Sequence, residues 1–247
     1  MTAGPHRAPV RLEFAQPLRF FLRARERATG EVASPWDGTS TLGHHVQSAG
    51  VPLTEVGRLS TDTGAVGPGE QPPPGARVHV EPVARPQRLP EGERFVLDVP
   101  LGALARRLRL LGVDTGYRND APDDALLAEA DESDAFLLTR DRGLLRRRAL
   151  RHGAYVRGSR PDDQLADVLD RFAPTLAPWT RCPVCNGVLA PVEKAEVASL
   201  LPAGTRRTYD VFARCSSCAR VYWRGAHAAR LDAIVAAATE GDGPPSG

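Results

Sequence analysis

The chain has 247 residues, of which 42% are hydrophobic and 25% charged, and its formal net charge of +2 does not by itself indicate a nucleic-acid partner. No apolar run approaches the roughly 18 residues that a transmembrane helix needs, and the first nine residues lack the apolar centre of a secretory signal. We therefore expect a cytoplasmic protein with no membrane partner, and the sequence leaves its oligomeric state open.

The first predicted domain covers residues 9–84, where apolar and polar residues alternate between turn signals. Residues 10–14 predict a strand, residues 18–28 a helix, and residues 76–83 a closing strand. Another helix is expected to begin near Ser40, a possible N-cap, and to end at Gly50. This order is typical of a ubiquitin-like β-grasp domain, which is an α+β fold. Residues 84–93 are rich in Pro, Arg and Glu and predict a linker.

Strand and helix patterns alternate in the second predicted domain, residues 94–173. Buried strands are predicted at 95–99 and 135–139, and shorter strands at 114–118 and 154–157. The predicted helices cover residues 101–111, closed by Gly112, and then 123–130, 142–151 and 162–172. Alternating βα units predict an α/β domain with a mostly parallel sheet, helices on both faces, and a reactive site at the carboxyl ends of the strands.

Acidic side chains follow the predicted strands of this domain. Asp98 ends the first strand, Asp141 follows the strand 135–139, and Asp123 and Asp124 open a helix just after another strand. Carboxylates at one rim repel each other unless a cation neutralises them, and oxygen ligands suit Mg²⁺ or Mn²⁺. Such an ion can activate water and stabilise the departing oxygen of a phosphodiester, so the pattern predicts phosphodiester hydrolysis.

Each carboxylate also has a purely structural explanation. Asp123, Asp124 or Asp141 could cap the helix that follows it, because Asp is favoured at helix N-termini. Asp98 is harder to explain in this way, because a carboxylate within an apolar strand needs a partner or a metal. The residues together are therefore better evidence for a metal site than any one of them.

Arginines crowd the segment beside Asp141, and a second basic stretch follows Asp98. Arginine binds phosphate through two hydrogen bonds, so both stretches fit a substrate with a phosphate backbone, although the first could simply be a solvated helix face. No histidine lies between Asp98 and Asp141, which argues against a histidine-driven RNase mechanism. The candidate substrate-binding residues are Arg106, Arg107, Arg140 and Arg142.

Two Cys-x-x-Cys pairs occupy the last third of the chain, namely Cys182 with Cys185 and Cys215 with Cys218. Each pair makes a tight knuckle with two thiolates, and two knuckles complete the tetrahedron of a structural Zn²⁺ site. A redox pair and an iron–sulfur site are the alternatives. Residues 178–232 are therefore predicted to form a zinc ribbon. Tyr222, which follows the second knuckle with Trp223, could stack on bases or pack against the ribbon.

Several of these stretches occur together in one known family. "FVLDVPLGALARRLRLLG", "YRNDAPDD", "LLTRDRGLLRRR", "RCPVCNGVL" and "CSSCARVYWRGAH" resemble, in this order, the Mut-seven C-terminal RNase family. The resemblance covers about residues 94–232 and implies a PIN-like nuclease with a three-layer parallel sheet, fused to a zinc ribbon. The residues before it resemble the ubiquitin-like domain that precedes this RNase in many bacterial members. The resemblance implies an active-site set of Asp98, Asp123, Asp124, Arg140 and Asp141, with the four cysteines as zinc ligands.

The chain departs from the family pattern at three places. Ala103 stands where members commonly have a lysine, so RNA binding is expected either to be weaker or to depend on Arg106 and Arg107. Ala219 replaces the glycine usual after the last cysteine, which is expected to strain that turn slightly. The N-terminal domain lacks a Gly-Gly end, so a role in binding a protein partner is expected rather than sulfur transfer.

The sequence thus predicts an RNase in which Asp98, Asp124 and Asp141 hold Mg²⁺ or Mn²⁺ and nearby arginines position RNA. The competing hypothesis is a non-catalytic RNA-binding adaptor that uses the zinc ribbon and the β-grasp domain. A DNA nuclease is a third hypothesis, because phosphate chemistry does not distinguish the sugars.

Overall fold

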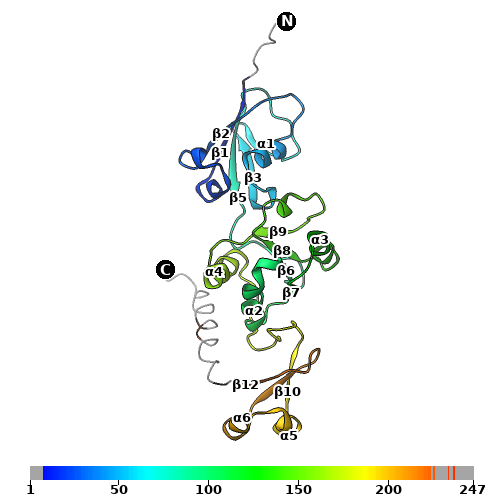
Figure 1. Ribbon diagram of the computed structural model, residues 1–247. Helices are drawn as coiled ribbons and strands as arrows, with labels where there is room; N and C mark the ends of the chain where they lie inside the picture. Colours follow the sequence, from blue (N-terminus) through cyan, green and yellow to red (C-terminus); the bar gives the residue numbers. More distant parts are fainter. Residues whose placement is uncertain (1–7, 224, 226–232, 234–235, 237–247) are drawn as a thin grey trace. The chain divides into compact units, whose positions relative to one another are not determined.

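A computed structural model describes residues 8–223, 225, 233 and 236 of the chain. Contacts divide the chain into two compact units (Figure 1). The first unit joins the described residues up to Gln87 with residues 141–155. The second joins residues 88–140 with the described residues from 156 onward. The predicted ribbon is part of the second unit, but residues 224 and 226–232 of it lie outside the described residues.

The N-terminal part of the first unit is a mixed sheet of the β-grasp type. Strand β1 is parallel to β5, and the other pairs are antiparallel, in the order β2-β1-β5-β3-β4. Core side chains of Val10, Leu12 and Phe14 alternate with more exposed ones along β1, as the sequence pattern predicts. The strands are β1 (Val10–Phe14), β2 (Glu31–Ser34), β3 (Val56–Thr61), β4 (Gly64–Val66) and β5 (Arg77–Pro82).

The helix α1 (Leu42–Ala49) begins one residue later than predicted. Thr41 is its N-cap, and the Thr41 hydroxyl accepts a hydrogen bond from the backbone N–H of His44. The Ser40 hydroxyl instead donates to Asp37, so Ser40 is not the cap. Gly50 ends the helix with a φ of 114°, a conformation that favours glycine.

The predicted helix at residues 18–28 is wrong, because the chain forms two short 3₁₀ helices there, η1 (Gln16–Phe21) and η2 (Ala24–Glu26). Leu22 and Arg23 between them are extended. Arginine side chains bind the carbonyls that a continuous helix would use, since Arg27 donates to the Leu22 carbonyl. Side-chain hydrogen bonds therefore override helix propensity in this segment.

The predicted basic helix at residues 142–151 is also wrong. Only η5 (Leu144–Arg146) is helical, and the short strand β9 (Gly153–Tyr155) follows it. Leu145 and Tyr155 are buried in the same core as the β-grasp sheet, with Leu150 packed against them. These apolar side chains do not have the spacing of one helical face, and their packing sets the path of the segment.

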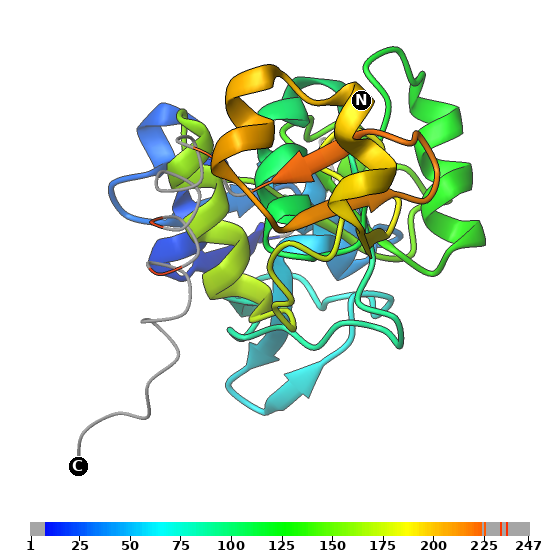
Figure 2. The same ribbon diagram turned by 90° about the horizontal axis from the view of Figure 1, so that it is seen from below.

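The second unit contains a parallel sheet with its helices. Strand β6 lies between β7 and β8 and is parallel to both. Phe172 of α4 packs edge-on against Phe95 and Phe136, so α4 covers one face of this sheet. Helix α3 lies on the opposite side (Figures 1 and 2), which confirms the predicted α/β layers. The elements are β6 (Phe95–Leu97), η4 (Val99–Leu101), α2 (Gly102–Leu110), β7 (Thr115–Tyr117), α3 (Asp123–Glu132), β8 (Phe136–Thr139) and α4 (Pro161–Phe172).

An antiparallel sheet of three strands carries the cysteines, in the order β10-β11-β12. Short helices between β10 and β11 lie against this sheet (Figure 2), and Val197, Leu201 and Phe212 form its small core. We call residues 181–223 the cysteine ribbon. Its elements are β10 (Leu189–Val192), α5 (Lys194–Val197), η6 (Ala198–Leu200), α6 (Ala203–Thr208), β11 (Phe212–Cys215) and β12 (Val221–Trp223). Among the described residues, none of the helices has the length and apolar character needed to cross a membrane.

Candidate active site and metal centre

The strand register of the parallel sheet places motif residues at one edge. Leu97 pairs with Tyr117 on one side and with Leu138 on the other. The next residue of each strand therefore reaches the same carboxyl edge, where parallel sheets carry their reactive groups. Two of these three residues, Asp98 and Thr139, are in direct contact.

Both carboxylate oxygens of Asp98 have partners. Oδ1 accepts the backbone N–H of Val99 at 2.7 Å, and Oδ2 accepts the Thr139 hydroxyl at 2.6 Å. Thr139 is fully buried, which fixes the hydroxyl position. The two bonds fix the plane of the carboxylate but use only part of its acceptor capacity, since a carboxylate offers about four lone-pair sites. Asp98 can therefore still ligate a cation.

Thr139 is the site residue that the sequence reasoning missed. In the stretch Thr139-Arg140-Asp141, the sequence predicts Arg140 and Asp141 as site residues. It is Thr139, however, that contacts Asp98, 41 residues earlier in the chain. A hydroxyl residue at the end of a buried strand, directly before a charged motif, is the signal that could have identified it.

Asp123 and Asp124 occupy the first turn of α3, which packs on β6 and β8. The N-cap of this helix is Pro122, and no side chain caps it. Capping therefore does not explain the two aspartates, although their charges favour the positive end of the helix dipole. Both residues are exposed.

Asp141 belongs to the first unit. Its Oδ1 accepts the backbone N–H of Gly143 at 2.6 Å, and its carbonyl accepts the N–H of Leu145. These bonds form a tight turn that leads into η5, a local role that Asp fills well.

A ready-made carboxylate cluster is not seen in the described part of the chain. The one group of three or more His, Cys, Asp or Glu side chains whose ligand atoms all lie within 4.8 Å of one another is the set of four cysteines. The structure thus brings Asp98 to Thr139 without grouping Asp98, Asp123 and Asp124 into such a set. A divalent-ion site at these carboxylates stays a prediction.

The candidate arginines differ in their surroundings. Arg107 pairs with Asp162 at 2.9 Å and donates to the carbonyl of Ala103. Arg142 donates to two backbone carbonyls of the first unit. Arg106 and Arg140 are exposed and make no hydrogen bond or ion pair with other described residues. These last two are the arginines best placed to bind a phosphate.

The four cysteine sulfurs form a compact metal-binding cluster. The sulfurs of Cys182 and Cys218 are 3.8 Å apart, and those of Cys185 and Cys215 are 3.4 Å apart. A tetrahedral site with Zn–S bonds of about 2.3 Å has sulfurs about 3.8 Å apart. The spacing and the softness of thiolate ligands therefore fit Zn²⁺.

Hydrogen bonds favour the thiolate form of Cys182, which is the form that binds a cation. Burial acts to raise the pKa of Cys182, but hydrogen bonds from the Tyr222 hydroxyl and the N–H groups of Cys185 and Val184 outweigh it and bring the pKa to about 6. Burial raises the pKa of Cys185 to about 12. Burial, followed by the bond to Cys182, also raises the pKa of Tyr222. Tyr222 therefore remains a neutral donor to a thiolate.

Each knuckle contains a residue whose backbone has the left-handed conformation. Asn186 has a φ of 68° and Ala219 a φ of 59°, a region that costs an L-residue energy. This confirms the expected strain at Ala219. Gly187 is required in the first knuckle, because an added Cβ would lie 2.8 Å from the Cys215 sulfur.

The first knuckle is attached to the parallel-sheet domain by a buried cation. Arg109 of α2 is 3% exposed and donates to the carbonyls of Thr115, Pro183 and Val184 at 2.9, 3.3 and 2.8 Å. Burial lowers its pKa, while negative charge on Cys185, Cys182 and Asp114 opposes that shift. Arg109 thus supplies positive charge beside the thiolates.

The side-chain amide of Asn186 adds two hydrogen bonds to this attachment. Asn186 accepts the Thr115 N–H at 3.1 Å and donates to Asp114 at 2.7 Å. Arg181 pairs with the other oxygen of Asp114 at 2.9 Å. The knuckle therefore provides hydrogen-bond partners for backbone and side-chain groups at the start of β7.

Tyr222 and Trp223 are engaged inside the ribbon. Tyr222 bonds the Cys182 sulfur at 3.0 Å, and Trp223 packs on Phe212 with ring centroids 6.5 Å apart. Of the two roles expected for these rings, the structure favours packing over stacking on bases.

Comparison with known families fits this geometry. The family described as Mut7-C RNAse domain matches residues 93–235, which is more than half of the chain. The chain belongs to the Mut7-C RNase domain family. The family described as Mut7-C ubiquitin matches residues 8–88. No curated protein and no solved structure matches the chain.

These two matches confirm the predicted order of a ubiquitin-like domain and an RNase domain. The Mut7-C RNase match includes the parallel sheet and the cysteine ribbon, and it implies a ribonuclease whose substrate is RNA. The individual bounds of the three predicted domains stay predictions.

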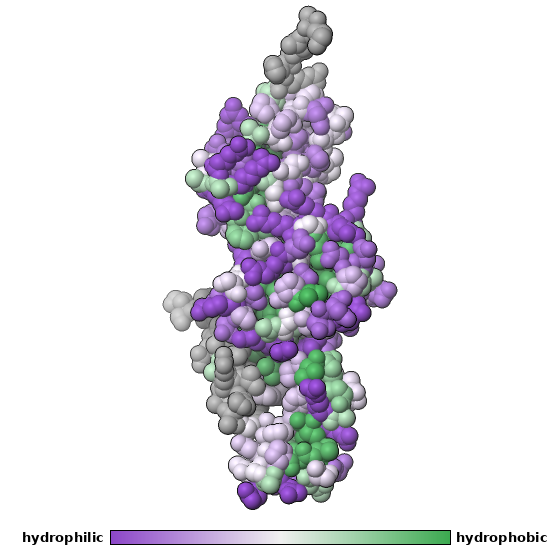
Figure 3. Space-filling view, viewed as in Figure 1, coloured by the Kyte–Doolittle hydropathy of each residue, from purple (hydrophilic) through white to green (hydrophobic). Residues whose placement is uncertain are grey.

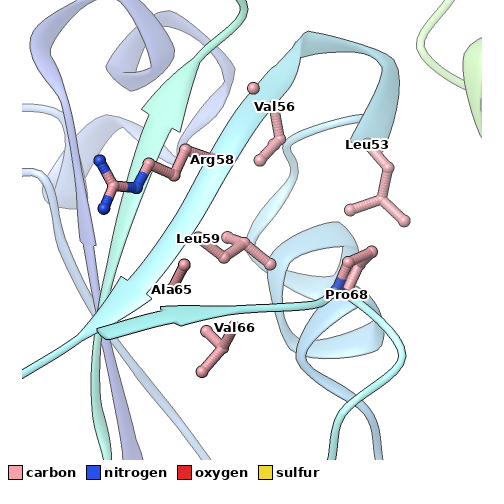
Figure 4. A pocket seen from close by; sticks show the side chains of 8 residues that line it. Leu53, Val56, Arg58, Leu59, Ala65, Val66 and Pro68 are labelled. Atoms are coloured by element: carbon pink, nitrogen blue, oxygen red, sulfur yellow. The ribbon is translucent and has the colours of Figure 1, made fainter. Parts of the chain in front are cut away.

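The Mut7-C ubiquitin domain contains a cavity of about 260 Å³ beside β3 and β4. Figure 4 shows Leu53, Leu59 and Pro68 around it, with the guanidinium of Arg58 extending away from them. The walls of the cavity are therefore mainly apolar, and Arg58 is the one charged residue among those that line it. Its lining residues are Leu53, Val56, Gly57, Arg58, Leu59, Ala65, Val66 and Pro68.

Apolar side chains are also exposed on the Mut7-C cysteine ribbon. Figure 3 shows hydrophobic surface over this part of the chain, between polar stretches. Val211 is 81% exposed, and Val184, Val188 and Leu200 are also exposed. The ribbon surface is thus apolar in part rather than uniformly basic.

Proposed function

We propose that this chain is a divalent-metal-dependent ribonuclease that hydrolyses RNA phosphodiester bonds. The proposal is supported by membership of an RNase family and by the hydrogen bond from Thr139 to Asp98, which joins two motifs at the carboxyl edge of the sheet. That hydrogen bond is the observation that carries the proposal. The proposed catalytic residues are Asp98, Asp123, Asp124 and Asp141.

Asp98, Asp124 and Asp141 would hold Mg²⁺ or Mn²⁺, because their oxygens are the ligand type that these ions prefer. When bound, the ion activates a water molecule and stabilises the departing oxygen. The Thr139 hydroxyl and the Val99 N–H hold the Asp98 carboxylate in one orientation. A fixed orientation lowers the cost of organising the site for reaction.

Arginines would bind the RNA backbone. Arg106 and Arg140 are exposed, so each can donate two hydrogen bonds to a phosphate. Arg107 and Arg142 already donate to protein groups, and their roles in RNA binding stay predictions. A protein partner of the Mut7-C ubiquitin domain also stays a prediction.

We propose Zn²⁺ as the ion of the cysteine cluster. Four thiolates complete its shell, so the site has no open position for substrate and its role is structural. The catalytic ion and the structural ion should therefore differ in their response to chelators.

The test compares cleavage of labelled RNA by the wild-type chain and by Asp98→Asn, with Mg²⁺ or Mn²⁺. We expect Asp98→Asn to lose activity by at least about 100-fold, because weaker binding of the ion removes the transition-state stabilisation, worth several kcal/mol, that the ion would supply. RNA binding and folding should persist. Asp62→Asn, an exposed aspartate in the β3–β4 turn, is the matched control and should cleave normally.

EDTA provides a second arm of this test. It should abolish cleavage at concentrations that leave the zinc content unchanged. Unaltered turnover by Asp98→Asn would refute the assignment of Asp98. Tight RNA binding without cleavage under any metal condition would favour the non-catalytic adaptor, and equal cleavage of DNA would favour a general nuclease.

A further inference from the structure

Residues 141–155 have an unexpected position in the fold. They lie within the Mut7-C RNase match, yet they cluster with the N-terminal residues in the first unit. Their contacts with the Mut7-C ubiquitin domain differ from those of a surface loop, because they include buried groups. We call residues 141–155 the docked segment.

Arg142 is the first anchor of the docked segment. Its Nη1 donates to the Phe21 carbonyl at 2.9 Å, and its Nη2 donates to the Phe20 carbonyl at 3.3 Å. Its guanidinium carbon also lies 5.2 and 5.1 Å from the ring centroids of Phe20 and Phe21. Hydrogen bonds and cation–π contacts thus hold one side chain to η1.

Tyr155 is the second anchor, at the other end of the segment. Its ring packs against Phe20 and Phe21 with centroids 5.4 and 5.3 Å away. Its backbone N–H donates to Glu55 Oε1 at 2.8 Å, and Glu55 is only 2% exposed. A buried carboxylate would be costly without such a partner, so this bond favours the docked arrangement.

Leu145 lies between these anchors and completes the docking. It is 3% exposed and belongs to the same hydrophobic core as Val10, Leu12 and Val80 of the β-grasp sheet. The docked segment therefore shares the core of the Mut7-C ubiquitin domain.

The anchors bear on the proposed catalytic residue Asp141. Asp141 directly precedes Arg142, and its carboxylate closes the turn onto the Gly143 N–H at 2.6 Å. We propose that the Mut7-C ubiquitin domain is the positioning element for Asp141, with Arg142 as the positioning residue that holds the turn. The catalytic consequence rests on the proposed function, whereas the docking itself does not.

The experiment uses full-length Arg142→Met, with Arg148→Met as the matched control. Arg148 is an exposed arginine of the same segment that makes no hydrogen bond or ion pair with other described residues. Two measurements are made on each protein: amide hydrogen exchange across residues 141–155, and RNA cleavage at varied Mn²⁺ concentration.

We expect Arg142→Met to speed exchange at residues 143–147 and to lower kcat between about 10-fold and 100-fold, as a small misplacement of a reacting group does. The Mn²⁺ concentration for half-maximal activity should rise. The KM for RNA should change little, because the Arg142 guanidinium already donates to the Phe20 and Phe21 carbonyls; a raised KM with unchanged exchange would assign Arg142 to RNA binding and overturn the proposal. Arg142→Lys keeps the charge but not the two-pronged geometry, so it should fall between wild type and Arg142→Met. Arg148→Met should leave exchange, kcat and Mn²⁺ dependence unchanged.

Two results would overturn the proposal. Unchanged exchange in Arg142→Met means that the anchor does not hold the turn. Faster exchange with unchanged kcat and Mn²⁺ dependence means that the turn does not position a catalytic group. If the wild-type chain cleaves no RNA under any metal condition, the proposed function fails, and the exchange measurement alone still decides whether Arg142 holds the docked segment.

Discussion

Asp98 illustrates how one side chain can serve both the fold and the chemistry. Its bond to the Val99 N–H caps η4, and its bond to Thr139 joins the ends of β6 and β8. Together these bonds make a partly buried carboxylate tolerable. The same bonds give it the fixed orientation that a metal ligand needs, so a structural role and a catalytic role for Asp98 do not conflict.

His45 makes the first unit sensitive to acid. It is 2% exposed, and its Nδ1 lies 2.7 Å from the Ser34 hydroxyl. Burial lowers its pKa below the ordinary value of 6.5. Because the unfolded chain then binds a proton more readily than the folded chain, stability is full above pH 6.5 and falls as the pH drops from 6.5 toward the lower folded pKa.

Denaturant unfolding of the full chain between pH 8 and pH 5 measures this effect. We expect the wild type to lose more free energy of unfolding below pH 6.5 than His45→Asn, whose amide does not titrate. His152→Asn, at a less buried histidine, is the matched control and should retain the wild-type loss. Equal losses in the wild type and in His45→Asn would show that another group causes the acid sensitivity.

At the scale of elements, the sequence predicts the buried strands well and the tertiary packing poorly. The apolar runs at β6 and β8 identify strands because both faces of a parallel sheet are buried. The sequence predicts a helix at residues 142–151, within the alternation of strands and helices. Leu145 instead packs into the β-grasp core, a contact distant in sequence that no local pattern reveals.

The residues of the candidate site divide in the same way, into those that local sequence predicts and those whose contacts are distant in the chain. The cysteine ligands follow from spacing alone, because each knuckle is a local structure. Thr139 and Arg109 were not predicted as site residues, because their partners are distant in the chain. Arg109 resembles its exposed neighbours in sequence, and only the position of the first knuckle shows that its guanidinium is buried.

Helix α2 depends on Arg109 for its attachment to the cysteine ribbon. Arg109→Met would remove the guanidinium that donates to the carbonyls of Thr115, Pro183 and Val184, and it would remove positive charge beside the thiolates. We expect the free energy of unfolding to fall by about 2–3 kcal/mol, since hydrogen bonds to charged groups contribute about 1.5–3 kcal/mol. Zinc should also transfer faster to a coloured chelator, which gives a direct measurement.

Arg106→Met provides the comparison on the same helix. Arg106 is exposed and makes no bond with other described residues, so its loss should change neither stability nor zinc transfer. If the two variants released zinc at the same rate, the buried guanidinium would have no part in holding the metal centre.

At the scale of the whole molecule, the compact units do not follow the order of the sequence. The docked segment belongs to the first unit although it lies within the RNase match, and the cysteine ribbon belongs with the parallel sheet. Deleting residues 1–87 would therefore expose the apolar face of the docked segment as well as remove a domain. Functional tests of the Mut7-C ubiquitin domain need substitutions in the full chain.

Removal of the proposed zinc should affect the two units differently. Metal binding stabilises the folded knuckles, so an emptied cluster should let them open and release the carbonyls of Pro183 and Val184 that bind Arg109. We expect a chelator strong enough to strip the cysteine cluster to speed amide exchange in α2 and β7. Exchange in β1 and β5, which lie in the first unit, should not change.

Zinc added back should restore slow exchange in α2 and β7, which separates loss of the metal from irreversible oxidation of the cysteines. Metal content measured on the same samples shows whether the cluster was emptied. An emptied cluster with unchanged exchange in α2 would mean that the first knuckle keeps its shape without the ion. The ribbon would then stay attached without the metal, through the carbonyls that bind Arg109 and through the bonds of Asn186 and Arg181 to Asp114.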